Sequence, residues 1–578
     1  MTEEDIVDKY RECYSALYNS APSDMQTVKQ HIEDLIRCNI HPSLAEVNRI
    51  TPEIVKEAST MMKCGKNDVS GEYTSDVFKF APDLLFEHLA EVFKSCAVHG
   101  SIPLEWLSCA FIPLYKGGLK DPRKFDSYRA IASASQLLKL MEYTILILWG
   151  DLMQSDSLQC GFKKKSSCSM ASWLVLEVCM YFNQRGTMVH GACLDLSKAF
   201  DKIQFSQLFS KLLEQGIPAV VVRVLSYGYM EQQAWVRTGG RNSSKFGITN
   251  GSRQGSVLSP AFFSIYINGM LQKLRKSKLG CHIAGIWMAA VMYADDLFIM
   301  APDPHVLQMM MNICHQYGSE HNLVFSPSKS SCIIFRGKRR LSKKPDPILL
   351  DGKPLKWTDQ CEHLGHVLHE TMSMDNDCNR AKKSYNARAA DMRDQLYFCT
   401  PEQKINGIQL FCSDAYGANT WLLFSQGAES FYKSYNYQVK MSFKLPVMTH
   451  TNIVEQVLCA NQLSLRKQVQ SRYVGFVKSL MRSPSKEIRI LSNLAIYDHR
   501  SSTCRNISYL NEITGLNVLC ESKGMVRAAL PNQSSVPVES WRSSLLLKLL
   551  EIRSKHSCKD MNISYKYLTE MINSLCIS

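Results

Sequence analysis

Apolar residues recur along the chain with two different periods, and the change of period predicts the elements. In the first hundred residues the spacing is close to 3.6, and Thr51-Pro52-Glu53 has the N-cap, first-turn proline and early acid that are typical of a helix start. Pro82 opens a second helical stretch, "PDLLFEHLAEVFKSC". We therefore expect a helical region that leads into the rest of the chain.

Strand-like and helix-like stretches alternate from about residue 188. "MVHGACLD" (188–195) is predicted to be a strand that ends at a carboxylate, and "FSQLFSKLLEQG" (205–216) an amphipathic helix that ends at its glycine. Residues 233–248 look like a hairpin that turns at Gly239-Gly240, and Ser259-Pro260 begins another apolar helix.

Two apolar strands then flank "YADD" (293–296), followed by a helix that begins at Asp303-Pro304 and a strand at 331–335. With the hairpin and the helix from 259 left aside as insertions, the order is β-α-β-β-α-β. This order is typical of an antiparallel sheet backed by helices. It brings the end of the 188–195 strand beside the YADD turn.

Three carboxylates therefore meet in the predicted sheet, namely Asp195, Asp295 and Asp296. Like charges this close repel one another and are hard to desolvate without a cation. Oxygen ligands suit hard divalent cations such as Mg²⁺, and two such ions can promote phosphoryl transfer. The alternative interpretation of an isolated YADD is an exposed turn with solvated acids.

Length, charge and cysteine content narrow the class of protein. The 578 residues suggest three or four domain-sized units, and the net charge of +14 favours a polyanionic partner, nucleic acid first and an acidic membrane second. The 21 cysteines lack a regular framework and the first ten residues are polar and acidic, so we expect an intracellular, reduced protein, cytoplasmic or nuclear. The best apolar run, Leu137 to Trp149, is too short to span a bilayer, which indicates a soluble protein with no membrane partner.

The segment "CEHLGHVLH" (361–369) gathers one cysteine and three histidines without the paired CxxC spacing of a structural zinc site. We interpret it as an apolar strand or turn edge that carries solvated histidines.

Several segments, in sequence order, resemble the reverse transcriptases of LINE-type, non-LTR retrotransposons. "ACLDLSKAFDKI" (192–203) and "YADD" resemble the two catalytic segments, and "NGSRQGSVLSPAFFSIYING" (250–269) the template and nucleotide platform. "FIPLYKGGLKDPRKFDSYRAI" (111–131) and "LQCGFKKKSSC" (158–168) resemble the fingers. "HNLVFSPSKSSCIIF" (321–335) matches the segment that carries a palm lysine, and "CEHLGHVL" (361–368) resembles the strand before the thumb.

The resemblance implies an α+β right-hand polymerase with fingers, a ferredoxin-like β-α-β-β-α-β palm, a thumb, and helical extensions at both ends. The expected units are a helical N-terminal extension (1–64), fingers and lead-in (65–187), palm with interleaved fingers elements (188–345), palm end and thumb (346–430), and a helical C-terminal region of unassigned role (431–578). In the last unit, basic amphipathic helices at 452–483 would either clamp template RNA or pack on the thumb.

The resemblance also implies roles for the acidic and cationic residues. Asp195, Asp295 and Asp296 would hold two Mg²⁺ ions, or Mn²⁺, with help from the backbone carbonyl of Leu196. Lys329 would donate a proton to the departing pyrophosphate. Asp201 is expected to cap or orient the turn that follows it rather than bind metal.

A second group of residues would bind the nucleotide. Lys116 and Arg129 would meet the triphosphate, Gln254 and Gly255 would line the nucleotide floor, and Phe200 would exclude a 2′-hydroxyl. Ala130 stands where many relatives have proline, and we expect it to loosen the loop that presents Arg129.

Two basic runs are expected to contact phosphates, with solvated surface as the alternative interpretation. They are Lys163, Lys164 and Lys165 in the first run, and Lys338, Arg339 and Arg340 in the second.

The resulting hypothesis is an RNA-directed DNA polymerase, a nucleotidyltransferase that copies an RNA template by extending a DNA primer with dNTPs. One alternative is a catalytically decayed or domesticated RNA-binding remnant; another, which Phe200 disfavours, is an RNA-directed RNA polymerase. No nuclease segment is recognised, so a separate nuclease is an expected partner, and the chain is expected to be one part of a larger element product or a truncated copy.

Overall fold

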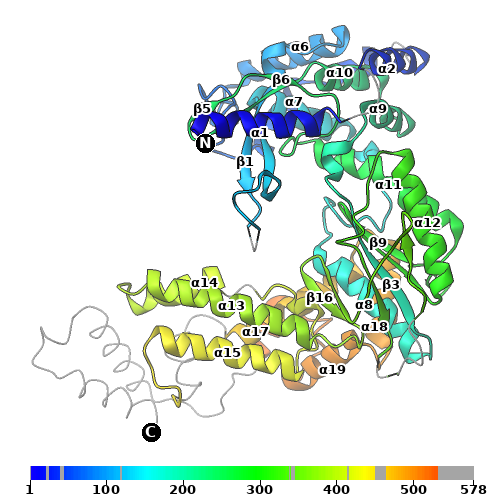
Figure 1. Ribbon diagram of the computed structural model, residues 1–578. Helices are drawn as coiled ribbons and strands as arrows, with labels where there is room; N and C mark the ends of the chain where they lie inside the picture. The colour runs from blue at the N-terminus through cyan, green and yellow to red at the C-terminus, as the bar shows by residue number, and fades with distance from the viewer. Residues whose placement is uncertain are drawn as a thin grey trace, which may run out of the picture.

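The computed structural model of the chain describes residues 2–20, 25–39, 44–117, 120–337, 339, 345–412, 415–449 and 464–530. Figure 1 shows three modules around a gap that opens to the left: a mixed helix and sheet module at the top, a sheet with helices on the right, and a helical module at the bottom. The hairpin of β1 (Ser108–Tyr115) and β2 (Tyr128–Ala134) points from the upper module toward the lower one.

The upper module is built on a five-stranded sheet with the order β2-β1-β4-β5, in which β6 also pairs with β4. Because β1 pairs with β4 in parallel, the hairpin predicted at 233–248 completes this sheet. The strands are β1 (Ser108–Tyr115), β2 (Tyr128–Ala134), β4 (Gln233–Thr238), β5 (Arg241–Asn242) and β6 (Phe246–Gly247).

Helices that precede the strands of this sheet in the sequence, or lie between them, complete the module. The predicted helix starts are confirmed: the Thr51 side chain accepts a hydrogen bond from the Ile54 backbone, and Pro82 precedes α6. The helices are α1 (Glu3–Tyr18), α2 (Met25–Asn39), α3 (Leu44–Asn48), α4 (Pro52–Met61), α5 (Asp76–Lys79), α6 (Asp83–His99), α7 (Gln136–Trp149), α9 (Phe205–Glu214) and α10 (Ala219–Met230).

The middle module contains the sheet β14-β11-β3-β10-β9. Its last four strands have the spatial order of a ferredoxin-like β-α-β-β-α-β unit, so the expected palm is confirmed. The strands are β3 (Val189–Asp195), β9 (Ala290–Tyr293), β10 (Asp296–Ala301), β11 (Ser331–Phe335) and β14 (Trp357–Thr358).

One detail of the predicted unit is wrong. We assigned the helix at 205–216 to the palm and treated the helix from 259 as an insertion. In the structure, α11 (Ser259–Ser277) contacts β9 and α12 (Pro304–Glu320), whereas α9 packs on α2, α10 and α11. The helical period locates an apolar face but does not say which sheet covers it.

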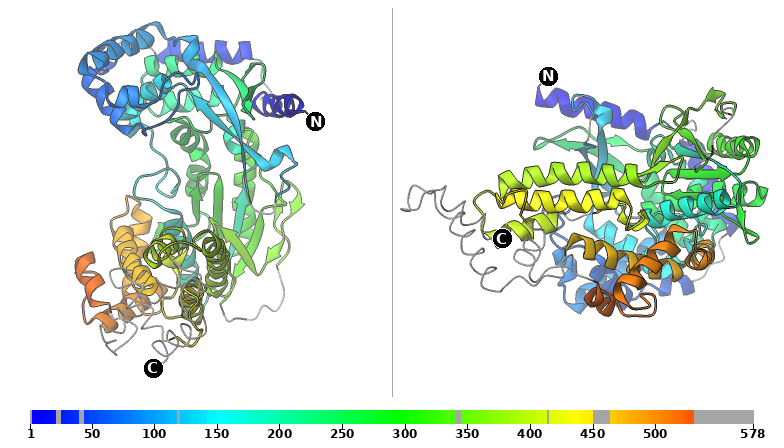
Figure 2. Two further views of the ribbon diagram at one scale, coloured as in Figure 1. Left: turned by 90° about the vertical axis from the view of Figure 1, so that its left-hand side faces the viewer. Right: turned by 90° about the horizontal axis from the view of Figure 1, so that it is seen from below.

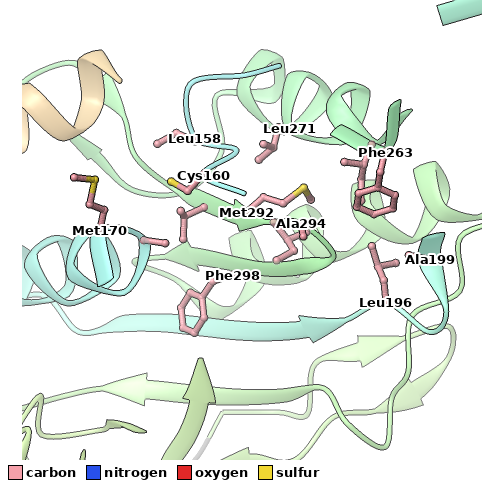
Figure 3. Close-up of a cluster of buried hydrophobic side chains, with 14 of the residues drawn as sticks. Leu158, Cys160, Met170, Leu196, Ala199, Phe263, Leu271, Met292, Ala294 and Phe298 are labelled. Carbon is pink, nitrogen blue, oxygen red and sulfur yellow. The ribbon is translucent and has the colours of Figure 1, made fainter. Parts of the chain in front are cut away.

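The core of the palm lies under the strand ends that carry the carboxylates. Figure 3 shows Met292 and Phe298 from the central hairpin in a cluster of buried apolar side chains that extends from Met170 to Phe263. All four are less than 5% exposed. The hairpin is therefore fixed by packing as well as by its hydrogen-bonded ladder.

The lower module begins with the hairpin of β15 (Gln360–His363) and β16 (His366–His369). Three helices follow: α13 (Asp375–Gln395), α14 (Pro401–Cys412) and α15 (Gln426–Ser442). Figures 1 and 2 show α13 and α15 side by side, in the position expected of a thumb.

The C-terminal helices brace the palm. They are α17 (Leu465–Met481), α18 (Lys486–Tyr497), α19 (Ser502–Thr514) and α20 (Lys523–Ala529). Glu177, on the palm helix α8 (Cys168–Gln184), is buried and accepts hydrogen bonds from the hydroxyls of Ser501, Ser502 and Thr503. Thr503 also accepts from the Trp173 indole at 3.0 Å. Residues 452–463 lie outside the described residues. The helix that follows them, α17, packs on α15 and on Ala418–Thr420, and the choice between clamping template RNA and packing on the thumb stays a prediction.

The remaining short strands form two-residue hairpins, β7 (His282–Ile283) with β8 (Ile286–Trp287) and β12 (Leu349–Leu350) with β13 (Lys353–Pro354). Within the described residues, no helix has both the length and the apolar composition needed to cross a bilayer.

Candidate active site

A row of carboxylates crosses the palm sheet at one end of β3. Asp296, the first residue of β10, lies directly opposite Asp195 on β3 and opposite Tyr293 on β9. Opposed residues on antiparallel strands point to the same face, with Cβ atoms about 5 Å apart. Asp295 lies in the two-residue turn of the hairpin, where Ala294 has a φ of 54°. The sheet register therefore brings together carboxylates that are a hundred residues apart.

The charges of this row perturb one another. Burial raises the pKa of Asp296 to about 6, and the negative charges of Asp295, Asp195 and Glu362 add to this effect. Burial and the charge of Asp195 also raise the pKa of Asp295, which the cations Arg129 and Lys329 oppose. The ammonium of Lys329 lies 3.1 Å from Asp195 Oδ2 and is largely exposed. The fold thus concentrates negative charge at a point that one lysine neutralises only in part.

The donor chemistry of the row fits a hard divalent cation, because every side-chain ligand is a carboxylate oxygen. Burial, with repulsion from the neighbouring carboxylates added, raises the pKa values of Asp295 and Asp296, and a cation would offset both effects. In the described part of the chain, no three acidic, histidine or cysteine side chains already converge into a finished metal cage. Leu196 follows Asp195 with its side chain buried, and the carbonyl of Asp195 itself accepts the backbone N–H of Ser326 at 2.9 Å.

The YADD turn is clamped by Gln159, which is fully buried. Gln159 Oε1 accepts the backbone N–H of Ala294 at 3.1 Å, and Nε2 donates to the Ala294 carbonyl at 3.3 Å. The residues on either side of Gln159 bond to the backbone of β9: the Leu158 carbonyl accepts the Met292 N–H, and the Cys160 N–H donates to the Met292 carbonyl. A Cβ at Gly161 would lie 2.3 Å from the Ala294 nitrogen, so this close approach requires glycine. The clamp fixes the turn that carries Asp295.

The predicted nucleotide floor is a tightly held loop. The carbonyl of Gln254 accepts the backbone N–H of Ala132 at 2.7 Å. Gly255 has a φ of 119°, and a Cβ there would lie 2.8 Å from the Ala132 carbonyl oxygen, so glycine is required for both reasons. Gln254 Nε2 donates to Asp201 Oδ1 at 2.9 Å. Asp201 therefore orients the floor, beyond its own turn.

A buried ion pair anchors the same loop to α7. Glu142 accepts the Ser256 hydroxyl at 2.6 Å and the Val257 backbone N–H at 2.8 Å. The Arg253 guanidinium lies 3.6 Å from it, and the side chains of both charged residues are at most 4% exposed. Glu142, the acidic residue that interrupts the apolar sequence of α7, therefore anchors the loop that carries Gln254 and Gly255.

The ring of Phe200 lies beside this floor. It stacks on Phe263 with ring centroids 4.0 Å apart and an interplanar angle of 17°, and it meets the edge of the exposed Phe162. The stack holds the ring in one orientation.

Cations gather where the fingers approach the palm. Lys116 donates to the Asp126 carbonyl at 2.6 Å, and Lys198 binds the Asp126 carboxylate at 3.0 Å. Burial lowers the pKa of Lys116, as do the positive charges of Lys120, Lys198 and Arg129. Among the described residues, no hydrogen bond or ion pair engages the exposed guanidinium of Arg129. A cluster of like charges of this kind favours an anionic ligand.

The expected effect of Ala130 is wrong. Arg129 lies within β2, which pairs with β1 from Tyr128↔Tyr115 to Ala134↔Cys109, so it stands on a regular strand rather than on a loosened loop.

In the two basic runs, some cations donate to backbone carbonyls of the protein and others are exposed to solvent. Lys163 donates to the carbonyls of Ser155 and Asp156 at 2.8 and 2.5 Å, whereas Lys164 and Lys165 are exposed. Arg339 donates to the carbonyls of Asn183 and Gly186, at the end of the sheet opposite the carboxylates. Lys338 and Arg340 lie outside the described residues. Phosphate contact by these runs stays a prediction.

The three histidines of the β15–β16 hairpin were expected to be solvated, and this is wrong for two of them, since only His369 is partly exposed. His363 and His366 are buried, with pKa values lowered by burial to about 3 and about 4. His363 Nδ1 contacts the Ser172 hydroxyl at 3.0 Å. Their role is packing between the palm helix and the thumb.

Sequence reasoning missed four residues that shape the site: Tyr18, Glu142, Gln159 and Lys198. Two of them carried a signal, since Glu142 interrupts an apolar helix and Gln159 stands between apolar neighbours. Tyr18 and Lys198 carried none, because their partners are distant in sequence.

Comparison with known proteins agrees with this geometry. Residues 119–368 match the family described as reverse transcriptase (RNA-dependent DNA polymerase). The RNA-directed DNA polymerase from the mobile element jockey of Drosophila melanogaster is 23% identical over 67% of this chain and 42% of its own length. A 115 kDa protein of the Drosophila melanogaster type-1 retrotransposable element R1DM is 24% identical over 53% of this chain and 29% of its own.

Among solved structures, a Candida albicans telomerase in complex with a fragment of telomeric RNA aligns with a TM-score of 0.35 and 11% identity, over 76% of this chain and 69% of that one. The chain spans less than half the length of the curated relatives named above. Residues 119–368 are therefore similar to reverse transcriptases, and the two relatives named above are proteins of a mobile element and of a retrotransposable element.

Proposed function

We propose that this chain is an RNA-directed DNA polymerase that copies an RNA template by extending the 3′-hydroxyl of a DNA primer with dNTPs. The observation that carries the proposal is the register of the palm sheet, which sets Asp195 directly opposite Asp296 with Asp295 in the adjoining turn. Adjacent acids on one clamped turn, facing a third acid across a ladder, suit metal-assisted phosphoryl transfer.

Asp195, Asp295 and Asp296, with the backbone carbonyl of Leu196, would hold two Mg²⁺ ions, for which Mn²⁺ could substitute. When bound, the ions supply a lowered pKa for the attacking hydroxyl and charge neutralisation at the leaving oxygen. Lys329 would act as the general acid, and this role is supported by its ammonium, which contacts the carboxylate row and is open to solvent.

The nucleotide would lie between the cationic cluster and the floor. Lys116 and Arg129 would bind the triphosphate, Gln254 and Gly255 would support the base and sugar, and Phe200 would exclude a 2′-hydroxyl. Support for the triphosphate role comes from the mutual repulsion of the cations, which an anion would relieve.

Template and primer would add phosphate contacts from exposed cations such as Lys164 and Lys165, a salt-sensitive and sequence-independent source of affinity. A separate nuclease for nicking of the target belongs to this proposal as a partner.

The alternative, a decayed RNA-binding remnant, is not favoured, because the carboxylates, the clamp on their turn and the glycine of the floor are all in place. An RNA-directed RNA polymerase would need room for a 2′-hydroxyl, which the fixed ring of Phe200 disfavours.

The test is primer extension by the purified chain on a homopolymeric RNA template with labelled dNTP and Mg²⁺. The Asp295→Ala/Asp296→Ala variant and a ribonucleotide reaction serve as controls. Extension by the wild type alone, with dNTP, supports the proposal. Equal extension by the folded variant would refute it, and preference for ribonucleotides would favour the RNA polymerase.

A further inference from the structure

The last turn of α1 lies against both loops that carry the nucleotide-binding residues. The carbonyl of Tyr18 accepts the backbone N–H groups of Thr249 and Asn250 at 3.0 and 3.1 Å. The Asn250 side chain in turn donates to the carbonyls of Leu17 and Asp201 at 3.2 and 2.7 Å. Residues at the start of the described chain are thus hydrogen-bonded to the segment that leads into Gln254.

The side chain of Tyr18 continues this connection toward the site. Its hydroxyl donates to Asp201 Oδ1 at 2.7 Å, and Gln254 Nε2 donates to the same oxygen at 2.9 Å. Tyr18 is 1% exposed and its ring stacks on Phe111 with centroids 4.8 Å apart. The ring therefore has no freedom to withdraw the hydroxyl.

The shared carboxylate decides how the Gln254 amide is oriented. An ionised carboxylate only accepts hydrogen bonds, so the amide must turn its nitrogen toward Asp201, which directs its oxygen away. Asp201 is buried, which raises its pKa, and the two donors oppose that rise. The backbones of Gly251 and Asp201 are closely packed, because a Cβ at Gly251 would lie 2.7 Å from the Asp201 carbonyl oxygen.

We propose that Tyr18 is a positioning residue for the incoming nucleotide: through Asp201 it fixes the amide of Gln254, so that the N-terminal helix forms part of the nucleotide floor. The inference rests on the proposed polymerase function. It assigns a role at the nucleotide site to a segment that precedes the matched reverse transcriptase domain by a hundred residues.

The chain offers a matched control on the same helix. Tyr14, one turn earlier, is also buried, and its hydroxyl has no hydrogen-bond partner among the described residues. Tyr18→Phe and Tyr14→Phe each remove one buried hydroxyl from α1 and leave the ring. Only the first is expected to change nucleotide handling.

The experiment measures kcat and KM for dTTP on a poly(rA) template, together with thermal unfolding of each variant. We expect Tyr18→Phe to raise KM about three- to tenfold, the range of one modest hydrogen bond, with kcat changed less. Tyr14→Phe should match the wild type. An unchanged KM in a folded Tyr18→Phe variant would overturn the inference, as would an equal rise in both variants.

A double-mutant cycle tests whether Tyr18 acts through Gln254. In a Gln254→Ala background, Tyr18→Phe should cause no further rise in KM, since the amide that it positions is gone. A full additional rise would show that Tyr18 acts by another route and would overturn the inference.

Stabilisation of the protein against heat by dTTP and Mg²⁺ gives a readout that does not require catalysis. If the wild type fails to extend primers yet is stabilised by dTTP, the polymerase proposal fails. The Tyr18 inference is then judged by whether Tyr18→Phe alone weakens that stabilisation. If the wild type neither extends primers nor is stabilised by dTTP, both fail.

Discussion

Replacement of Asp296 by asparagine should stabilise the metal-free protein while it abolishes polymerisation. The side chain keeps its size and Asp296 keeps its backbone pairing with Asp195, but one charge leaves the carboxylate row. Without a cation the carboxylates repel one another, so the folded protein becomes more stable when one of their charges is removed. A residue whose only role was structural would give the opposite result.

The magnitude follows from the pKa of Asp296, which rises from an ordinary value of 3.8 to about 6. Each pKa unit corresponds to about 1.4 kcal/mol, which sets an upper limit of roughly 3 kcal/mol for the cost of ionising the group in the fold. The side chain is partly open to solvent, so screening reduces this to about 1–2 kcal/mol. For a domain of some 150–250 residues, each kcal/mol moves Tm by roughly 2–4 °C.

The pH dependence has a definite sign. Because the pKa of Asp296 is higher in the folded protein than in the unfolded chain, ionisation of this carboxyl disfavours the fold. The cost is complete above about pH 6, shrinks as the pH falls from about 6 to about 4, and is absent below, where both states are protonated. The variant should therefore exceed the wild type in stability at pH 7.5, and the gap should close toward pH 4.

The assay is thermal unfolding in EDTA from pH 4 to 8, with Asp151→Asn as a control that removes one charge from an exposed aspartate. Addition of Mg²⁺ should then raise the Tm of the wild type more than that of Asp296→Asn. If the variant is less stable than the wild type in EDTA at pH 7.5, or if the gap does not depend on pH, the proposed charge repulsion is refuted.

Three further predictions concern the residues around the row. Phe200→Ala should lower the preference for dNTP over rNTP by about tenfold or more, measured as a ratio of kcat/KM values, and an unchanged ratio would remove Phe200 from sugar selection. Glu142→Gln leaves Arg253 buried without its counter-charge, so unfolding should become easier by about 3–5 kcal/mol in urea titrations; a loss below 1 kcal/mol would contradict an anchoring role. Gln159→Ala frees the turn at Ala294 and should reduce kcat at least tenfold with RNA binding intact, whereas normal kcat would show that the clamp is dispensable.

Much of the palm could be predicted because its information is local. A short apolar run predicts each strand. The polar residues that interrupt or end these runs, such as Asp195 and Asp295, differ clearly from their apolar neighbours. The β-α-β-β-α-β order then determines which strands are adjacent. Strand order alone was enough to expect that the strand end with Asp195 meets the YADD turn.

What could not be predicted depends on partners that are distant in sequence. The hydrogen bond from Tyr18 to Asp201 joins residues 183 positions apart, and neither tyrosine nor aspartate is unusual in its local context. The same reason explains the wrong helix in the palm, since α9 and α11 are both amphipathic and only tertiary contacts distinguish them. His363 and His366 were misjudged as solvated because they lie on the one face of the hairpin that is buried, and the sequence does not show which elements cover that face.

The brace that joins α8 to the start of α19 has a consequence for biosynthesis. Glu177 leaves the ribosome 324 residues before Ser501, the first of its hydroxyl partners. At about 5–20 residues per second, roughly 15–65 s pass during which the palm helix has been made and its partners have not. In that interval the Glu177 carboxylate and the Trp173 indole lack the hydroxyls that later bind them. The nascent palm therefore stays open along this helix until translation reaches the C-terminal helices, a period in which chaperone binding would protect it.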